Sequence, residues 1–150
     1  MIAVIQRVSS AKVVVDNQTI SEIEKGMVVL VGIAQEDNMS DIEWLSKKII
    51  GLRIFADDEN KMNENLETCQ GEILLISQFT LLASTKKGNR PSFVNAAKPE
   101  IAKQLYETLG VTLGKALSKN IKMGIFGADM KVSLTNDGPV TILLDSKNQQ

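Results

Sequence analysis

The beginning of the chain arranges apolar and polar residues in a pattern that predicts β-strands. Residues 2–7, Ile-Ala-Val-Ile-Gln-Arg, fit the two-residue period of a strand. Residues 27–33 form a continuous apolar run, which is typical of a central strand. Two further strands are expected at residues 13–15 and 19–23, with a turn at residues 16–18 between them. These four short strands indicate a meander that curls toward a barrel.

Two later segments have the apolar spacing of a helix. The first is expected to begin at Ser40, as the N-cap of a capping box with Glu43, and to end at Gly51. The second is expected to begin at Pro99, because proline suits the first turn of a helix. It carries an apolar stripe with a spacing of four residues, which favours core packing over a cofactor site. The stripe consists of Ile101, Leu105, Leu109, Leu113 and Leu117.

The remaining segments predict strands and loops. The turn chemistry of residues 135–141, which include Asn-Asp-Gly-Pro, predicts a hairpin between two final strands, and residues 146–150 are expected to fray. Because strands do not alternate regularly with helices, a doubly wound fold is disfavoured. We therefore expect one α+β domain over residues 1–150, a mainly antiparallel, barrel-like sheet with two to three helices. The other strands are expected at residues 52–55, 72–76, 131–134 and 142–144.

Polar side chains interrupt the apolar stretch that follows the strand expected at residues 72–76. Ser77, Gln78 and Thr80 carry hydroxyl and amide groups, which cost free energy when buried unless they are hydrogen-bonded. Two interpretations are open: a strand that leaves the core for solvent, which this segment taken alone favours, or a ligand site on rigid backbone whose N–H groups face a reacting oxygen. Apolar packing is expected to continue through Phe79, Leu81 and Leu82.

A basic loop follows these polar residues. Residues 84–93 contain Lys86, Lys87 and Arg90, together with Phe93. The loop is either an ordinary solvated segment or a surface that contacts nucleic-acid phosphates beside the candidate ligand site. Lysine and arginine neutralise backbone phosphates, and the loop begins only a few residues after Thr80, which favours the second interpretation.

The amino-acid composition narrows the chemistry. The chain has no histidine and one cysteine, Cys69. This composition excludes Ser-His-Asp and Cys-His catalysis within the chain, and it excludes metal sites built from histidine or several thiolates. Any hydrolysis must use backbone groups, hydroxyls, carboxylates, lysine or the substrate itself. We expect no metal and no cofactor.

Net charge and apolar run lengths bear on partners and location. The net charge is −1, so binding to nucleic acid requires a local basic patch. No apolar run approaches the ~20 residues needed to span a bilayer, so no membrane association is expected. The first residues do not fit a signal peptide, and a single cysteine suits a reducing compartment, so a cytoplasmic protein is expected.

Two motifs that occur together in this chain resemble the D-aminoacyl-tRNA deacylases. They are Ser-Gln-Phe-Thr-Leu at residues 77–81 and Asn-Asp-Gly-Pro-Val-Thr at residues 136–141. The resemblance extends nearly from end to end, with departures at Ser84, where the family often has aspartate, and Ile125, where it often has arginine. The supporting segments are residues 3–8, 52–55, 61–63, 90–93 and 126–130.

The resemblance implies a homodimer of small barrel-like subunits with active sites at the dimer interface. It implies that Gly138 and Pro139 form a cis pair that reaches into the partner's site, and that Arg7 holds this loop in place. From the residues alone, Arg7 fits an ordinary exposed strand charge. A trans bond is also favoured on the residues alone, because only about 5–6% of X-Pro bonds in folded proteins are cis. Asn136 belongs to the same motif and is expected to take part in substrate binding and chiral selection.

The reaction that the resemblance implies is hydrolysis of the ester that joins a D-amino acid, or glycine, to the terminal adenosine of tRNA. Ser77 and Gln78 are expected to position the ester and the water, and N–H groups near Phe79 and Thr80 to stabilise the oxyanion. The tRNA 2′-hydroxyl is expected to assist the water. The resemblance places Met130 in a pocket wall and Phe126 near the adenosine, and Lys86, Lys87 and Arg90 are expected to contact tRNA.

Three alternatives stay open at this point. Thr80 could act as a covalent nucleophile, although the sequence offers no base to activate it. The chain could be a non-catalytic module that binds tRNA or a nucleotide through the same basic loop. It could also be a purely structural dimer, which gives no reason for the polar strand end.

Overall fold

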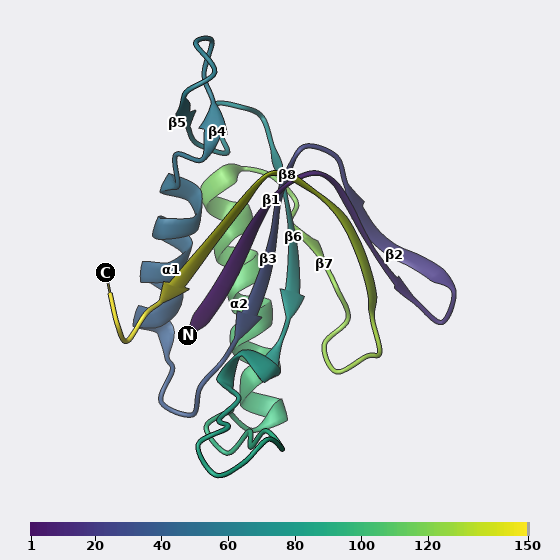
Figure 1. The fold of residues 1–150 in the computed structure, drawn as a ribbon, viewed down its shortest axis with the longest axis vertical. Helices are drawn as coiled ribbons and strands as arrows, with labels where there is room; N and C mark the ends of the chain where they lie inside the picture. The colour runs from purple at the N-terminus through teal and green to yellow at the C-terminus, as the bar shows by residue number, and fades with distance from the viewer. Residues whose placement is uncertain (150) are drawn as a thin grey trace.

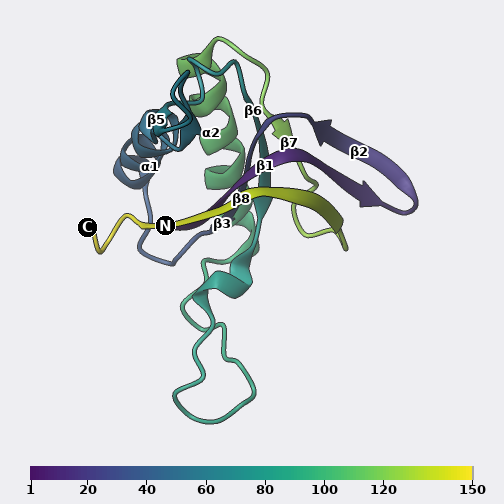
Figure 2. The same ribbon diagram turned by 45° about the horizontal axis from the view of Figure 1, so that its top comes forward.

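A six-stranded mixed sheet, bent into a nearly closed barrel-like shape, carries two helices on one face (Figures 1 and 2). The structure is a computed structural model and describes residues 1–149. No helix among these residues is long and apolar enough to cross a membrane. The elements are β1 (Ile2–Val15), β2 (Gln18–Ile23), β3 (Gly26–Gly32), α1 (Met39–Gly51), β4 (Phe55–Ala56), β5 (Met62–Glu64), β6 (Glu72–Ser77), the 3₁₀-helix η1 (Phe79–Leu82), α2 (Pro99–Leu117), β7 (Lys122–Met123) and β8 (Lys131–Asp145).

The long strand β1 organises the sheet. One edge of β1 pairs with β8, and the other edge pairs first with β3 and then with β2, all antiparallel. Beyond β3, the strands β6 and β7 are added in parallel. The chain between β3 and β6 contains α1, in keeping with the long crossover that parallel pairing needs. The α+β class with two helices is therefore confirmed. The sheet is mixed rather than purely antiparallel, because the pairings of β1 are antiparallel whereas those of β6 are parallel.

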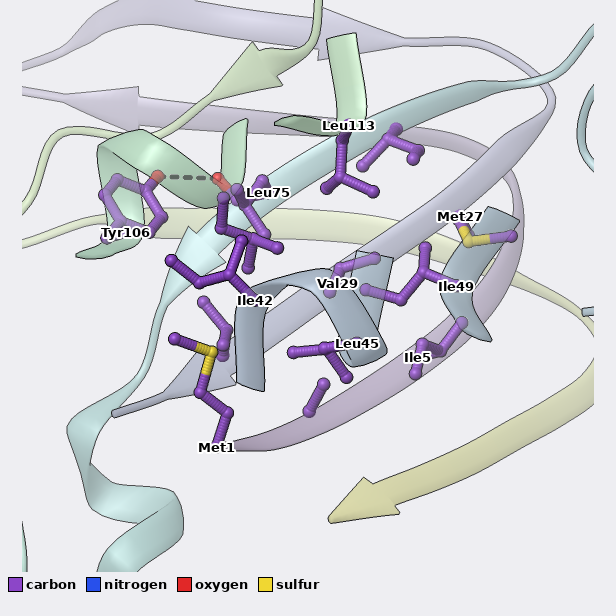
Figure 3. Close-up of a cluster of buried hydrophobic side chains, with 14 of the residues drawn as sticks. Met1, Ile5, Met27, Val29, Ile42, Leu45, Ile49, Leu75, Tyr106 and Leu113 are labelled. Carbon is purple, nitrogen blue, oxygen red and sulfur yellow. Dashed lines mark hydrogen bonds between the residues drawn. The ribbon is translucent and has the colours of Figure 1, made fainter. Parts of the chain in front are cut away.

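The central strands are apolar on both faces because each face of the sheet has its own core. Along β6, Ile73 and Leu75 pack toward the helices, whereas Leu74 and Ile76 pack into a second cluster inside the curled sheet. Along β3, Val29 and Val28 divide in the same way. Figure 3 shows the first cluster, in which side chains of α1 and α2 meet those of the sheet. The continuous apolar runs of the sequence thus correspond to doubly covered strands.

Two expected strand pairs are single strands in the structure. Residues 2–7 and 13–15 belong to one strand, β1, and the hairpin expected at residues 135–141 is absent because β8 continues through it. Gln6 pairs with Thr141 and Val8 pairs with Asn136, so four residues of β8, 137–140, lie opposite Arg7 alone. The turn chemistry therefore produces a bulge within a strand instead of a reversal of the chain. We call residues 137–140 the Gly-Pro bulge.

Helix boundaries and the apolar stripe also differ in detail. The N-cap of α1 is Asn38 rather than Ser40, and Asp41, not Glu43, completes the capping box. In α2, Ile101 is exposed, and the buried face includes Tyr106 instead. The expected strand at residues 52–55 is reduced to the short β4, which pairs with β5 in a separate two-stranded sheet. The apolar packing expected beyond β6 holds for Leu82, which is buried, but not for Phe79, which is 58% exposed.

A buried polar cluster joins the beginning of the described chain to its end, contrary to the expected fraying. The ammonium group of Met1 donates hydrogen bonds of 2.6 Å to Asp37 and 2.6 Å to Ser146. The Ser146 hydroxyl donates to Asp41 at 2.6 Å, and Lys147 donates to the other oxygen of Asp41 at 2.9 Å. Ser146 is buried, so the chain is anchored at least to Lys147. Gln150, which was expected to fray as well, lies outside the described residues.

Asp41→Asn is expected to lower the free energy of unfolding at pH 7 by on the order of 2 kcal/mol. Burial on its own raises the pKa of Asp41, but hydrogen bonds from Ser146, Lys147 and Asn38 outweigh it and hold the pKa at about 2, below the ordinary 3.8. Because the folded-state pKa is depressed, the carboxylate stabilises the fold above about pH 4, and this contribution is lost as the pH falls toward 2.

Urea unfolding of both proteins at pH 7 and near pH 2 measures this contribution. The difference between the wild type and Asp41→Asn should shrink at the lower pH. Asp58→Asn, at an exposed position, is the control and should change stability little at either pH. A difference that stays constant from pH 7 to pH 2 would contradict the assigned role of Asp41.

Candidate active site

The polar strand end lies beside a cavity of about 490 Å³. Ser77, Gln78 and Phe79 line this cavity, which we call the β6 cavity. No hydrogen-bond partner is found for the Ser77 hydroxyl within residues 1–149, so this group is available to a ligand. The interpretation of the polar interruption as a ligand site therefore fits the geometry better than a strand that merely runs into solvent.

Main-chain donors are available at the same place. The chain turns from β6 into η1, and the N–H groups of Phe79 and Thr80 have no backbone acceptor within residues 1–149. The N–H of Gln78, by contrast, donates to the carbonyl of Val31 at 2.7 Å and fixes the strand end. The Gln78 amide donates to the Thr80 hydroxyl, which is exposed and does not line the β6 cavity. The first two N–H groups of η1 thus form a preset pair of donors.

The opposite side of the β6 cavity is the segment of residues 126–130, which we call the 126–130 wall. Phe126 and Met130 both line the cavity and are half-buried, so the structure brings these two predicted residues together with Ser77 and Gln78. The wall packs closely on the strand, because a Cβ added at Gly124 would lie 2.6 Å from the Met130 sulfur and 3.0 Å from Cδ1 of Ile76 in β6. Asp129 of this wall is 2.8 Å from Lys131 in an exposed ion pair.

Sequence analysis missed a third side of the β6 cavity. Ala96 and Ala97 before α2, and Pro99 and Ala102 within its first turn, line the cavity. The apolar stripe of this helix predicts core packing alone. The small side chains around the helix start leave room for a ligand where larger residues would fill it, but in the sequence they do not differ from ordinary packing, so no signal marked them.

The basic loop is attached to the strand end by aromatic contact. The rings of Phe79 and Phe93 meet edge to face, with centroids 4.9 Å apart. Ser84 and Ser92 close the base of the loop by two backbone hydrogen bonds of 2.8 and 2.9 Å. Figure 2 shows the long connection between η1 and α2 projecting away from the sheet. The cations of this loop, Lys86, Lys87 and Arg90, are all exposed.

Arg7 is not an ordinary exposed strand charge. Its side chain is 13% exposed, and its Nε atom donates to the carbonyl of Asp137 at 2.8 Å. Its Nη1 atom donates to the carbonyl of Ile54 at 2.6 Å, which ties the Gly-Pro bulge to the chain before β4. The bond between Gly138 and Pro139 is cis, as the family resemblance implies and against the expectation from the residues alone. Arg7 is therefore hydrogen-bonded to the bulge, and its role in holding the bulge for a partner's site stays a prediction.

The Gly-Pro bulge does not line the β6 cavity of its own chain. Arg7 pairs with Met27, which pairs with Ile73, four positions before Ser77 along β6. Four residues span roughly 13 Å along a strand, and the three steps from β8 to β6 span roughly 14 Å across the sheet. Asn136 and the Gly138-Pro139 pair are exposed in the single chain. The structure thus separates the predicted site residues into two groups that one subunit does not bring together.

Together these features define a small α+β barrel with a ligand cavity at the end of a central strand, lined by main-chain donors, a hydroxyl, an amide and apolar walls. Within residues 1–149, no group of three or more Cys, Asp or Glu side chains is placed to hold a metal ion. The family model for D-Tyr-tRNA(Tyr) deacylase matches residues 4–145. The chain belongs to this family.

Individual relatives agree with the family assignment. A D-aminoacyl-tRNA deacylase from Flavobacterium psychrophilum is 56% identical over 150 residues, which cover all of both chains. A solved structure named c-Myc DNA Unwinding Element Binding Protein has a TM-score of 0.92 at 43% identity, and the match covers 97% of this chain and 98% of that one. A structure of a probable eukaryotic D-amino acid tRNA deacylase has a TM-score of 0.82 at 16% identity, covering 95% and 97%, and shares the fold.

Proposed function

We propose that this chain is a hydrolase that cleaves the ester bond of D-aminoacyl-tRNA, and of mischarged glycyl-tRNA, to free amino acid and tRNA. Membership of the deacylase family supports this activity. The observation that carries the proposal for this chain is the unengaged N–H group of Phe79, which lines the β6 cavity, together with the equally unengaged N–H group of Thr80, the next residue of the chain. Aminoacyl-tRNA occurs in the cytoplasm, where we propose that the protein acts.

The reaction needs no titrating side chain of the protein. A water molecule attacks the ester carbonyl carbon, and the negative charge that forms on the carbonyl oxygen is stabilised by the N–H groups of Phe79 and Thr80, each worth up to ~3–4 kcal/mol. The bond to the 3′-oxygen of the tRNA then breaks, and that oxygen takes a proton originally from the water. Ser77 and Gln78 position the ester and the water, and the neighbouring 2′-hydroxyl of the tRNA assists the proton transfer.

The remaining residues of the β6 cavity hold the 3′ end of the substrate. Phe126 packs near the terminal adenosine and Met130 forms the pocket wall, in agreement with their places in the 126–130 wall. Lys86, Lys87 and Arg90 neutralise tRNA phosphates, and their loop is joined to the strand end through Phe93 and Phe79.

Chirality is selected by the partner subunit in a homodimer. The Gly-Pro bulge of one chain enters the β6 cavity of the other, where its carbonyl oxygens bind the α-ammonium group of the substrate and Asn136 supports them. A D side chain then points to solvent, whereas an L side chain points into backbone and is excluded. The exposure of the bulge and its separation from its own cavity support this arrangement.

Thr80→Val is expected to keep most of the single-turnover rate, within about threefold of the wild type. The Thr80 hydroxyl contacts the Gln78 amide, which cannot act as a base, and it does not line the β6 cavity. Its main-chain N–H is unchanged by the substitution. A loss of several orders of magnitude in single-turnover rate would instead favour Thr80 as a covalent nucleophile.

The proposed function is tested by incubating the purified protein with D-Tyr-tRNA, L-Tyr-tRNA and Gly-tRNA and measuring free tRNA over time. We expect rapid hydrolysis of the D ester, measurable hydrolysis of the glycyl ester and no hydrolysis of the L ester above background. A chelator should not change these rates. Comparable hydrolysis of the L ester would contradict the proposed exclusion of L-aminoacyl-tRNA. If no ester were hydrolysed, the proposed activity would be wrong and the non-catalytic nucleic-acid module would be favoured.

A non-catalytic nucleic-acid module is the second candidate. The observation that favours it is the exposed basic loop, together with the similarity to a solved structure named as a DNA-binding protein. Under this interpretation, the three esters would stay intact while tRNA binds with an affinity that falls as salt increases.

A further inference from the structure

A buried tyrosine lies where the strand that leads to the candidate site meets the 126–130 wall. Tyr106, the only tyrosine of the chain, is 2% exposed and lies on the buried face of α2. Its hydroxyl donates to the carbonyl of Leu75 at 2.8 Å, as Figure 3 shows, and lies 3.3 Å from the carbonyl of Gly124. One hydroxyl hydrogen thus serves two carbonyl groups from different parts of the chain.

Both carbonyl groups belong to segments that lead directly into the candidate site. Leu75 precedes Ser77 by two residues in β6, and Gly124 precedes Phe126 by two residues. The Gly124 N–H also donates to the Leu75 carbonyl at 3.0 Å, so the same oxygen joins the two segments twice. The ring of Tyr106 packs against that of Phe126, with centroids 5.9 Å apart.

The Tyr106 hydroxyl is suited to a permanent structural hydrogen bond. Burial raises the pKa of Tyr106, so the group stays protonated and remains a donor at neutral pH. Tyr106 does not line the β6 cavity, so it does not touch the substrate. Met130 packs so closely on Gly124 that there is no free space between them, and a displacement of Gly124 must therefore move the wall.

We propose that Tyr106 is a positioning residue for the proposed deacylation. Its hydroxyl fixes the distance between β6 and the 126–130 wall, and so sets the width of the β6 cavity where the terminal adenosine is proposed to bind. The proposal rests on the proposed function for its link to catalysis, but the structural bond can be tested without it. In Tyr106→Phe the ring stays, the Leu75 carbonyl keeps the Gly124 N–H, and the Gly124 carbonyl loses its donor.

Steady-state kinetics with D-Tyr-tRNA provide the first test. Because the wall binds the adenosine equally in the ground state and in the transition state, Tyr106→Phe should raise KM about tenfold and change kcat by less than about threefold. Ile49→Val, which removes one buried methyl group from α1 in the same core, is the control for lost stability and should leave KM unchanged. An unchanged KM, or a fall in kcat alone, in Tyr106→Phe would overturn the proposal.

Amide hydrogen exchange provides a second test that does not depend on activity. In Tyr106→Phe the protection of the amides of residues 124–130 should fall at least about tenfold, whereas in Ile49→Val it should fall no more than in the rest of the sheet. Equal loss of protection in the two variants would overturn the proposal. If the wild type fails to hydrolyse D-Tyr-tRNA, the proposed function fails, and this exchange experiment still decides whether the hydroxyl holds the wall.

Discussion

Gly138→Ala is expected to lower the rate of D-Tyr-tRNA hydrolysis at least about 100-fold while the chain stays folded. A Cβ atom at this position would lie 2.8 Å from Nη2 of Arg7 and 3.0 Å from Cγ2 of Val140, and the backbone φ is +127°, which L side chains rarely adopt. The Gly-Pro bulge must therefore shift, and the carbonyl oxygens that we propose as ligands for the substrate ammonium move with it.

Gly88→Ala is the matched control, measured in the same single-turnover assay at saturating enzyme, so that a change in tRNA affinity through its basic loop does not enter the rate. Gly88 has a similar φ of +131°, but a Cβ atom there meets nothing within 4 Å, so the substitution adds backbone strain without a clash. We expect its rate to stay within a few-fold of the wild type and both variants to show cooperative thermal unfolding. Wild-type activity in Gly138→Ala would contradict the role of the bulge in substrate binding.

The parts of the fold that the sequence predicted are those fixed by nearby residues. Continuous apolar runs identified β3 and the core of β6, because a strand covered on both faces needs no polar side. Pro99 correctly marked the start of α2, where the missing N–H costs nothing. The cap of α1 was misplaced by two residues because Asn38 and Ser40 are both good caps. They are distinguished by two hydrogen bonds: the Asn38 N–H donates to the Asp41 carboxylate, and the Asn38 side chain accepts from the Ser40 N–H.

The parts that the sequence could not predict depend on distant residues. Asn-Asp-Gly-Pro has the composition of a reversing turn, yet β8 runs straight on because β1 pairs with it on both sides of the bulge. The guanidinium of Arg7, 130 positions away from Asp137, donates a hydrogen bond to the Asp137 carbonyl in the bulge. Local turn chemistry does not carry this information, so the hairpin prediction failed at the point where tertiary pairing decides the outcome.

The residues of the candidate site also fall into those that the sequence could identify and those that it could not. Ser77 and Gln78 were identifiable because polar side chains in an apolar strand are conspicuous, and the structure places both at the β6 cavity. Ala97 and Ala102 were not identifiable, since small apolar residues at a helix start do not differ from ordinary packing. The Gly-Pro bulge was identified only through the family resemblance, and its separation from the cavity is the reason that a second subunit enters the proposal.

Phe79→Pro is expected to reduce the hydrolysis of D-Tyr-tRNA by roughly 10²–10³-fold, because it removes one main-chain donor from the proposed oxyanion site. Proline is tolerated at this position, since Phe79 is the first residue of η1 and its N–H has no backbone acceptor within residues 1–149. Phe79→Ala keeps the N–H while it removes the ring, so it is the control and should lose much less activity.

A mixed dimer of Phe79→Pro and Gly138→Ala subunits then separates the two possible arrangements of the site. The two chains are co-expressed with different C-terminal tags and purified over both tags in turn. If the Gly-Pro bulge serves the partner, one of the two sites combines an intact strand end with an intact bulge, and the mixed dimer should keep about half of the wild-type activity. If the bulge serves its own chain, both sites carry a lesion and the mixed dimer should be as inactive as either parent. If no complex carrying both tags is recovered and each chain is purified as a monomer, the dimer is excluded, and with it the selection of D over L substrates by the partner subunit.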